Sequence, residues 1–81
     1  MLSKELRQKH DGALMPTYGR FPVALTSGRG AVAVDADGRE YVDFGSGIGV
    51  NSLGYADPEW VAAVQAQAAA LQHISNLYYS P

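Results

Sequence analysis

Hydrophobic and polar positions alternate most clearly in two short runs near the middle of the chain. Ala31–Val34 and Glu40–Phe44 are rich in β-prone residues, and Asp35–Gly38 between them has the composition of a tight turn. The pattern predicts an antiparallel β-hairpin. A lone hairpin is marginal in water, so we expect this one to pack on another surface.

A helical period follows further along, from Glu59 to about Gln72. Asp57-Pro58-Glu59 supplies a capping residue, a first-turn proline and an acid beside the positive end of the helix dipole. Apolar residues then recur on one stripe that we expect to be buried: Val61, Val64, Ala68 and Leu71. The pattern predicts a helical segment over 57–72 and an aromatic tail over 73–81.

The start of the chain carries weaker helical signals. Ser3 is predicted to cap a mostly charged helix from Lys4 to His10, and Asp11-Gly12 to end it. This N-terminal helical segment is assigned to residues 1–12, and its composition predicts weak anchoring to the rest of the fold.

Residues 13–27 have no helical period and are predicted to form an extended arm. Pro16 and Pro22 bias the residues before them toward β or polyproline geometry. The arm is nevertheless apolar at Leu14, Met15, Tyr18, Phe21, Val23 and Leu25. An extended apolar segment needs a surface to lie on.

Three alternating glycines directly follow the hairpin, within DFGSGIGVNSLGY at 43–55. Glycine loses more backbone entropy on folding than any other residue, so Gly45, Gly47 and Gly49 indicate a sharp turn or a close approach of another molecule to the backbone. The spacing does not match a dinucleotide-binding loop and no Gly-Lys-Ser/Thr follows, so phosphate binding is the least favoured alternative. The predicted small antiparallel sheet, with this glycine turn, spans 28–54.

Composition limits the class of protein. The chain has 81 residues, a net charge of −2 and no cysteine, which fits one small α+β unit. No basic field suggests nucleic acid, and no apolar run is long enough to span a membrane. The polar start MLSKELRQKHDG does not resemble a signal peptide, so the expected location is cytoplasmic.

No metal site is predicted. Asp35 and Asp37 precede Gly38 as in a calcium loop, but the third carboxylate and the distant Glu are missing, so a hairpin turn is favoured. His10 and His73 have no acidic or histidine partner at ligand spacing. We expect His10 near a helix C-terminus and His73 in a structural role.

No catalytic residue is predicted either. A lysine that forms a Schiff base is usually desolvated or placed beside another cation, and the polar helix gives Lys4 and Lys9 neither. Ser46 and Ser75 have no nearby base. The five tyrosines suit a ligand pocket, although packing or an interface is the commoner reason for them.

Longer stretches resemble one family. They are YGRFPVAL (18–25), SGRGAVAVDADGREYVDFGSGIGVNSLGY (27–55), DPEW (57–60) and AAALQHISNLYYSP (68–81). They resemble the beginning of a subgroup III, ornithine-type aminotransferase that uses pyridoxal 5'-phosphate, and most of all its acetylornithine branch. One departure is Tyr55-Ala56-Asp57-Pro58, where many relatives have His-x-His-Pro.

The resemblance implies an N-terminal segment of a fold-type I aminotransferase: arm, small antiparallel sheet and connecting helix. Family members are several times longer, and their cofactor-binding and catalytic residues lie downstream, so none is assigned here. The intact relative would transfer an amino group between N-acetylornithine, or a related ω-amine, and 2-oxoglutarate, as a homodimer. The 81-residue chain alone is expected not to bind the cofactor specifically or to transaminate.

Four substrate-binding residues are implied by position in the family. Tyr18 matches a tyrosine near the substrate carboxylate, and Ser46, Gly47 and Ile48 match a loop beside the substrate. In ornithine aminotransferases the position of Ile48 resembles a tyrosine that contacts the substrate side chain. An isoleucine there would favour an acylated amine over a free ammonium group.

Two other functions stay open. The chain could be a non-catalytic remnant or interaction module that docks on a full-length subunit through Tyr18, Phe21 and Tyr78. It could also be a small phosphate- or nucleotide-binding domain that uses Gly45–Gly49. A reading frame that continues past Pro81 into cofactor-binding motifs would favour the aminotransferase.

Overall fold

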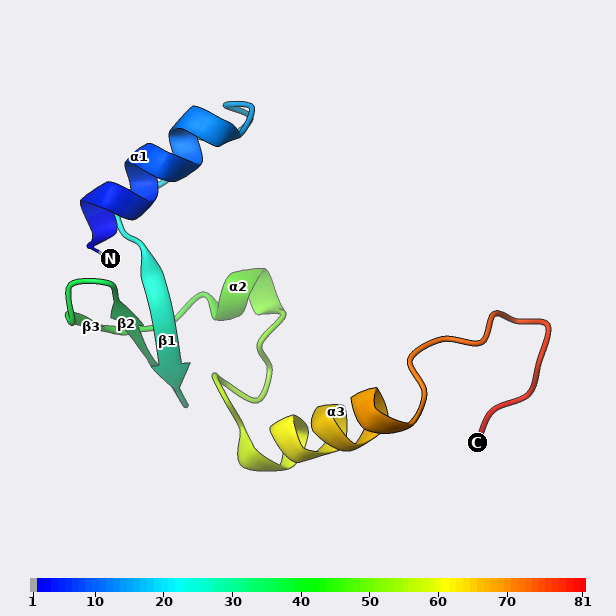
Figure 1. Ribbon diagram of the computed structural model, residues 1–81. Coiled ribbons are helices and arrows are strands. Elements are labelled where there is room, and N and C mark those ends of the chain that lie inside the picture. Colours follow the sequence, from blue (N-terminus) through cyan, green and yellow to red (C-terminus); the bar gives the residue numbers. More distant parts are fainter. Residues whose placement is uncertain (1) are drawn as a thin grey trace.

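Three helices and one small sheet make up the computed structural model, which describes residues 2–81 (Figure 1). The elements in chain order are α1 (Ser3–Ala13), β1 (Leu25–Arg29), β2 (Val32–Asp35), β3 (Glu40–Val42), α2 (Ser46–Gly49) and α3 (Pro58–Ala70). The strands form one antiparallel sheet in the order β1-β2-β3. The predicted α+β class is confirmed.

The predicted hairpin is present as β2 and β3. Val32 pairs with Val42 and Val34 with Glu40. The turn between the strands is organised by Asp35: its Oδ1 accepts the backbone N–H groups of Asp37 and Arg39, both at 2.9 Å. The Tyr41 hydroxyl donates to Oδ2 of the same carboxylate at 2.8 Å. Asp35, which a calcium loop would use as a ligand, therefore accepts hydrogen bonds within the hairpin instead.

A third strand lies where the arm was predicted to continue. β1 begins at Leu25 and pairs antiparallel with β2, from Leu25 opposite Asp35 to Arg29 opposite Val32, with a register shift between Leu25 and Ser27. The prediction of an arm up to residue 27 was therefore wrong in its last residues. The sequence LTSGR has weak strand propensity, and its strand depends on the partner that β2 supplies.

The first helix differs from its prediction at both ends. Leu2, not Ser3, holds the N-cap position, and its backbone N–H donates to the Glu5 carboxylate at 3.3 Å. Ser3 is instead buried, with its N–H donating to Asp37 Oδ1 at 3.3 Å. The helix also continues through Asp11 and Gly12 to Ala13. Its start is therefore docked on the hairpin turn, which the sequence alone did not indicate.

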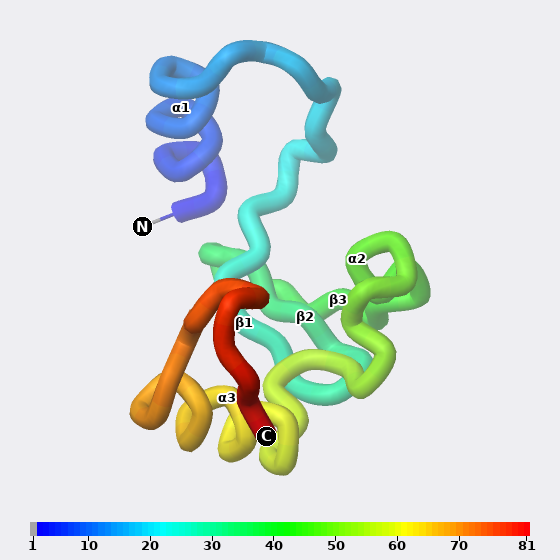
Figure 2. The backbone as a smooth tube through the Cα atoms, turned by 90° about the vertical axis from the view of Figure 1, so that its right-hand side faces the viewer, coloured from blue at the N-terminus to red at the C-terminus, as the bar shows by residue number. Residues whose placement is uncertain are grey.

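The last helix has the predicted cap but not the predicted burial. Asp57 Oδ2 accepts the N–H of Trp60 at 3.0 Å, and the helix ends at Ala70, two residues before Gln72. No residue of α3 is buried, and Val64 on the predicted stripe is 47% exposed. The prediction of a buried stripe was wrong for this chain, because α3 leads away from the sheet (Figures 1 and 2).

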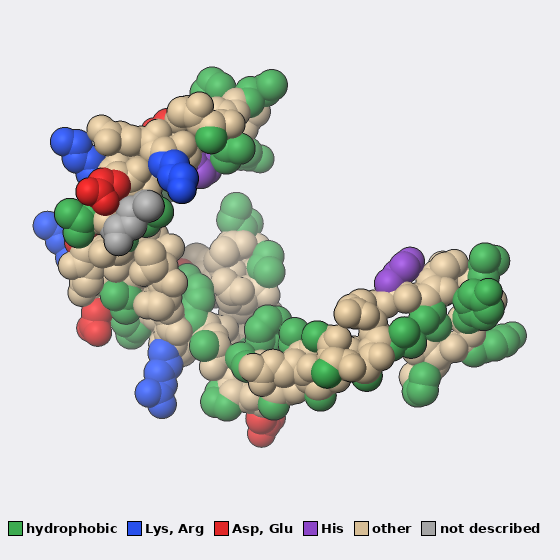
Figure 3. Space-filling model, in the orientation of Figure 1, with side chains coloured by type: hydrophobic (Ala, Val, Ile, Leu, Met, Phe, Trp, Pro, Cys, Tyr) green, Lys and Arg blue, Asp and Glu red, His purple; other side chains and the backbone are tan. Residues whose placement is uncertain are grey.

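Apolar surface is uncovered over much of the molecule. The radius of gyration is 16.8 Å, whereas a compact domain of this length has about 12 Å. The accessible surface is 7311 Å², against about 4,700 Å² for a compact protein of this mass. Among the described residues, Ala33 is the one buried hydrophobic side chain. Figure 3 shows apolar side chains at the surface along α3, the tail and the end of α1.

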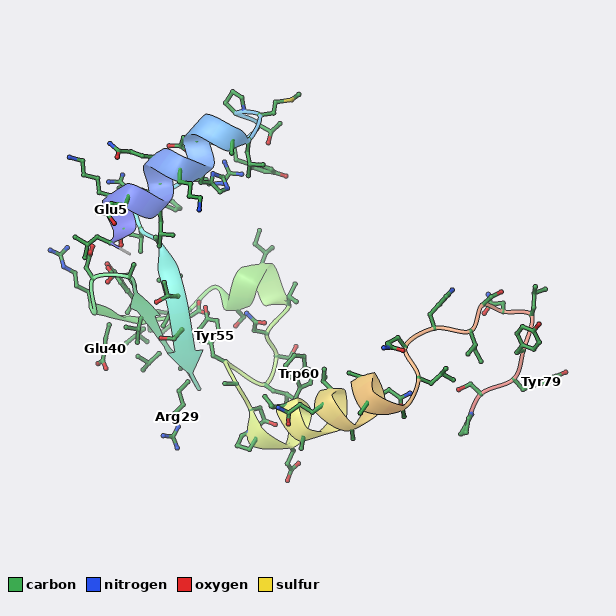
Figure 4. All side chains as sticks on the ribbon, in the orientation of Figure 1. Glu5, Arg29, Glu40, Tyr55, Trp60 and Tyr79 are labelled. Atoms are coloured by element: carbon green, nitrogen blue, oxygen red, sulfur yellow. The ribbon has the colours of Figure 1, made fainter. Side chains whose placement is uncertain are left out.

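The segment after α2 returns to the sheet at Tyr55. Gly30 N donates to Tyr55 O at 3.0 Å and Tyr55 N to Gly30 O at 2.9 Å, which makes an isolated antiparallel bridge. The Tyr55 ring lies so close to Gly28 that a Cβ added there would stand 2.6 Å from the ring carbon Cγ. Figure 4 shows Tyr55 between β1 and α2. Glycine at position 28 is therefore required by the ring.

This contact predicts the effect of Gly28→Ala. The added methyl group must displace the root of the Tyr55 ring, and overpacking of this kind typically costs about 1–3 kcal/mol. Gly19→Ala is the control, because a Cβ at Gly19 meets nothing within 4 Å. Urea unfolding of the chain, followed by the amide resonances of β2, measures both. Equal stability of the two variants would contradict the close contact.

Candidate functional site

The alternating glycines form a left-handed turn rather than an ordinary tight turn. The four residues of α2 all have positive φ: 52° at Ser46, 60° at Gly47, 61° at Ile48 and 77° at Gly49. For residues other than glycine this conformation costs roughly 1–2 kcal/mol each, and for a β-branched residue such as isoleucine it is an outlier. The turn is therefore strained at Ser46 and Ile48.

The left-handed turn projects into solvent. The Ile48 side chain is 100% exposed, and the glycines on either side of it are exposed as well. The turn closes on itself through hydrogen bonds from Gly49 N to Gly45 O at 3.1 Å and from Asn51 N to Ser46 O at 2.9 Å. It presents one apolar side chain flanked by bare backbone, which a ligand could approach closely.

Asp43 connects the turn to the sheet. Its Oδ1 accepts the backbone N–H groups of Gly45 at 2.7 Å and Ser46 at 3.0 Å. Hydrogen bonding from the Tyr55 side chain, and then from these two N–H groups, holds the pKa of the Asp43 carboxyl below its ordinary value. The same contact raises the pKa of the Tyr55 hydroxyl. Sequence reasoning missed both residues, although an Asp two positions before a Gly is a turn signal.

The second carboxylate–tyrosine pair, Asp35 and Tyr41, has a structural role. Burial would raise the pKa of Asp35, but the N–H of Arg39, the Tyr41 hydroxyl and the N–H of Asp37 outweigh it and hold that pKa below its ordinary value. Hydrogen bonding to Asp35 raises the pKa of Tyr41. All these partners lie in the hairpin, so this pair stabilises the turn between β2 and β3.

Tyr18 lies apart from the other three predicted substrate residues. It lines a groove of about 860 Å³ between α1 and the arm, which none of Ser46, Gly47 and Ile48 lines. The Arg20 guanidinium sits 5.6 Å from the centroid of the Tyr18 ring, a cation–π arrangement. The structure therefore groups the loop residues in one place and leaves Tyr18, 76% exposed, in another.

No residues within 2–81 fit pyridoxal phosphate. Lys4 and Lys9 are both exposed on α1, away from the left-handed turn.

Over the same residues there is no group of three His, Cys, Asp or Glu side chains that could hold a metal ion. No helix in the described part of the chain has the length and apolar character needed to cross a membrane.

Sequence comparison identifies the family. The profile of the class-III aminotransferases matches residues 14–81, and the chain therefore belongs to that family. It is 49% identical over 80 residues to an acetylornithine aminotransferase of Haemophilus ducreyi, which covers 99% of this chain and 20% of that protein. It is 48% identical over 79 residues to a mitochondrial acetylornithine aminotransferase of Alnus glutinosa, over 98% of this chain and 18% of that protein.

Structure comparison gives the same family. The crystal structure of acetylornithine aminotransferase from Elizabethkingia anophelis superposes with a TM-score of 0.95 and 27% identity, over 100% of this chain and 21% of that one. The predicted resemblance and fold class are confirmed. The chain spans about a fifth of the length of these relatives.

Acidification should weaken the stabilisation that the carboxylates of Asp35 and Asp43 give to the fold. A carboxyl whose pKa is lowered by folding stabilises the fold fully above the ordinary Asp value of about 3.9, and this contribution is lost as the pH falls through the folded pKa. Carboxyl ¹³C NMR should therefore give titration midpoints below that value for Asp35 and Asp43, with the Ser46 amide following Asp43. In Asp43→Asn the Ser46 response should disappear. An Asp43 midpoint at or above the ordinary value would contradict the hydrogen bonds described.

Proposed function

We propose that this chain is the substrate-facing N-terminal segment of an acetylornithine-type aminotransferase. The complete enzyme would transfer an amino group between N-acetylornithine and 2-oxoglutarate, a step of arginine biosynthesis. The names of its relatives support this substrate, and its membership of the class-III family supports the reaction type. The cofactor implied by the family is pyridoxal phosphate, which stabilises carbanions when bound.

The strained turn at Ser46–Gly49 is the main observation that supports the proposal. A non-glycine residue in a left-handed conformation persists only where the surroundings impose it, and such residues gather at functional sites. Here Ile48 has positive φ and is wholly exposed between two glycines. An apolar side chain at this place suits the neutral acylated end of N-acetylornithine and disfavours the ammonium group of ornithine, which would lose its hydration against it.

The other predicted residues have simpler roles. Gly47 and Gly49 allow the substrate to approach the backbone, and the half-buried Ser46 fixes the start of the turn. Tyr18 offers a hydroxyl for the substrate carboxylate from the arm. The described residues do not fit the cofactor, so cofactor attachment and proton transfer belong to residues outside 2–81.

The uncovered surface supports a homodimeric assembly of the complete enzyme. The arm, α3 and the tail expose large apolar side chains, among them Phe21 at 89% and Tyr79 at 105%. Large exposed apolar patches mark sites where a protein, a membrane or a ligand makes contact. In the complete enzyme we assign the covering of this surface to the remaining chain and to a second subunit. The docking of an isolated 81-residue chain on a full-length subunit uses the same surface and is the second candidate function.

A chimeric enzyme tests the substrate. In it, the aligned residues of the Haemophilus ducreyi enzyme are replaced by this chain. We expect this chimera to transaminate N-acetylornithine. Ile48→Gly should lower kcat/KM for this substrate by about 10- to 100-fold, which corresponds to the free energy gained by burying one such side chain. The melting temperature should not fall, because glycine relieves the strained φ.

Val50→Gly is the matched control, since Val50 is also exposed and β-branched but has right-handed backbone geometry. It should leave kcat/KM within about twofold, as surface substitutions usually do. Ile48→Tyr should raise the use of ornithine relative to N-acetylornithine. Equal kinetics for the Ile48 and Val50 variants would rule out the assigned contact.

The isolated chain should lack activity. Lys4 and Lys9 are its two lysines, and both are exposed on α1. Titrating pyridoxal phosphate into the 81-residue chain should give weak, unsaturable absorbance from surface adducts. A saturable visible band that is lost in Lys4→Ala or Lys9→Ala, together with turnover of N-acetylornithine, would disprove this.

A further inference from the structure

Asn51 is fixed by its backbone in the segment that leads from α2 toward α3 (Figure 1). Its N–H donates to the Ser46 carbonyl at 2.9 Å, and its own carbonyl accepts the N–H of Gly54 at 3.0 Å. The first of these bonds closes the left-handed turn from its far end. Because both backbone groups of Asn51 are engaged, the position of this residue relative to the turn is set by the fold.

The side chain of Asn51 lies against the turn. Its amide nitrogen Nδ2 is 3.3 Å from the place that a Cβ on Gly47 would occupy, and the residue is half-buried. Gly47 has a φ of 60° and directly precedes Ile48. The absence of a side chain at Gly47 therefore leaves room for the amide next to the backbone that carries the exposed Ile48 side chain.

The side-chain amide of Asn51 is not used within residues 2–81. The hydrogen bonds that Asn51 makes to these residues come from its backbone. An asparagine amide carries two donors and an accepting oxygen, and polar groups removed from solvent are normally hydrogen-bonded. Asp43, by contrast, already accepts the N–H groups of Gly45 and Ser46. Asn51 therefore places a free donor and a free acceptor against the turn.

We propose that Asn51 is a specificity-determining residue whose side-chain amide hydrogen-bonds the acetamido group of N-acetylornithine, while Ile48 contacts the methyl carbon of that group. The inference rests on the proposed function, because it assigns the polar half of the group that Ile48 is proposed to receive. An acetamido group has one accepting oxygen and one N–H donor, and an asparagine amide can complement both.

The direction of this hydrogen bond adds to the discrimination by Ile48. The ammonium group of ornithine has donors only, so it cannot accept a hydrogen bond from Nδ2 of Asn51. A site built around a hydrogen bond rejects a substrate that cannot form it, because a polar group of the protein is then left without a partner. Ile48 disfavours the ammonium group through lost hydration, and Asn51 disfavours it through an unpaired donor.

The first test uses the 81-residue chain and needs no activity. The backbone N–H of Asn51 should be protected from hydrogen exchange by its bond to Ser46. Its side-chain NH₂ should exchange within about threefold of the rate in the urea-unfolded chain, because it has no protein partner. A side-chain NH₂ slowed by more than about tenfold would show an amide already bonded within the chain, and would overturn the proposal. An unprotected backbone N–H would also overturn it, because the turn would then not hold Asn51.

The second test uses the chimeric enzyme and the ratio of kcat/KM for N-acetylornithine to kcat/KM for ornithine. Asn51→Asp keeps the shape of the side chain and replaces its donor by an anionic acceptor. The ratio should fall about 10- to 100-fold, with a lower value for N-acetylornithine and a higher value for ornithine. Asn51→Leu should lower the value for N-acetylornithine about 3- to 10-fold without raising that for ornithine, because it removes the bond and adds no charge.

Ser52→Asp is the matched control, since it places the same charge on the next residue, which is exposed. It should leave the ratio within about threefold, because solvent screens an exposed charge. Melting temperatures report any loss of folding, and the isosteric Asn51→Asp decides the question if Asn51→Leu is unstable.

Two further outcomes separate the role of Asn51 from the proposed function. Equal ratios for Asn51→Asp and Ser52→Asp, in a chimera that Ile48→Gly impairs, would overturn the role of Asn51 and leave the proposed function standing. A chimera that does not use N-acetylornithine would refute the proposed function and, with it, the role of Asn51.

Discussion

The carboxylate of Asp35 is the interaction on which the rest of the structure depends. It is 5% exposed, and it binds the N–H groups of the hairpin turn and the Tyr41 hydroxyl. The neighbouring residues extend the connection: Ala36 N donates to Ala24 O at 2.9 Å at the entry to β1, and Asp37 accepts the N–H of Ser3 at the start of α1. In a chain with so small a core, hydrogen bonds rather than apolar packing define this junction.

The left-handed turn is supported by the same sheet. The sheet is short, but its register fixes where β3 ends and therefore where Asp43 stands. β1 in turn fixes Tyr55 through Gly28 and Gly30. A strained left-handed turn can then persist at the edge of the sheet and keep Ile48 exposed. The sheet thus gives the strained turn a stable support, an arrangement that is common where loops bind ligands.

Features with local causes could be predicted from the sequence. The hairpin follows from its turn residues, and the α3 cap follows from Asp57-Pro58. The strand at Leu25–Arg29 could not, since LTSGR forms a strand through its partner, and neither could the docking of Ser3 against Asp37. The stripe of α3 has the right period but no covering surface within this chain. At the candidate site, resemblance pointed to Ile48, whereas the hydrogen bonds that Asp43 accepts from Gly45 and Ser46 are seen only in the fold.

A crystal structure of the chimeric enzyme with bound N-acetylornithine tests the central claim most directly, namely that the left-handed turn faces the substrate. The account predicts Ile48 carbons within about 4.5 Å of the acetyl group, the distance of apolar contact, with Asp43 still bonded to the Gly45 and Ser46 N–H groups. An acetyl group bound elsewhere, with Ile48 turned away from it or the turn in right-handed geometry, would contradict the account.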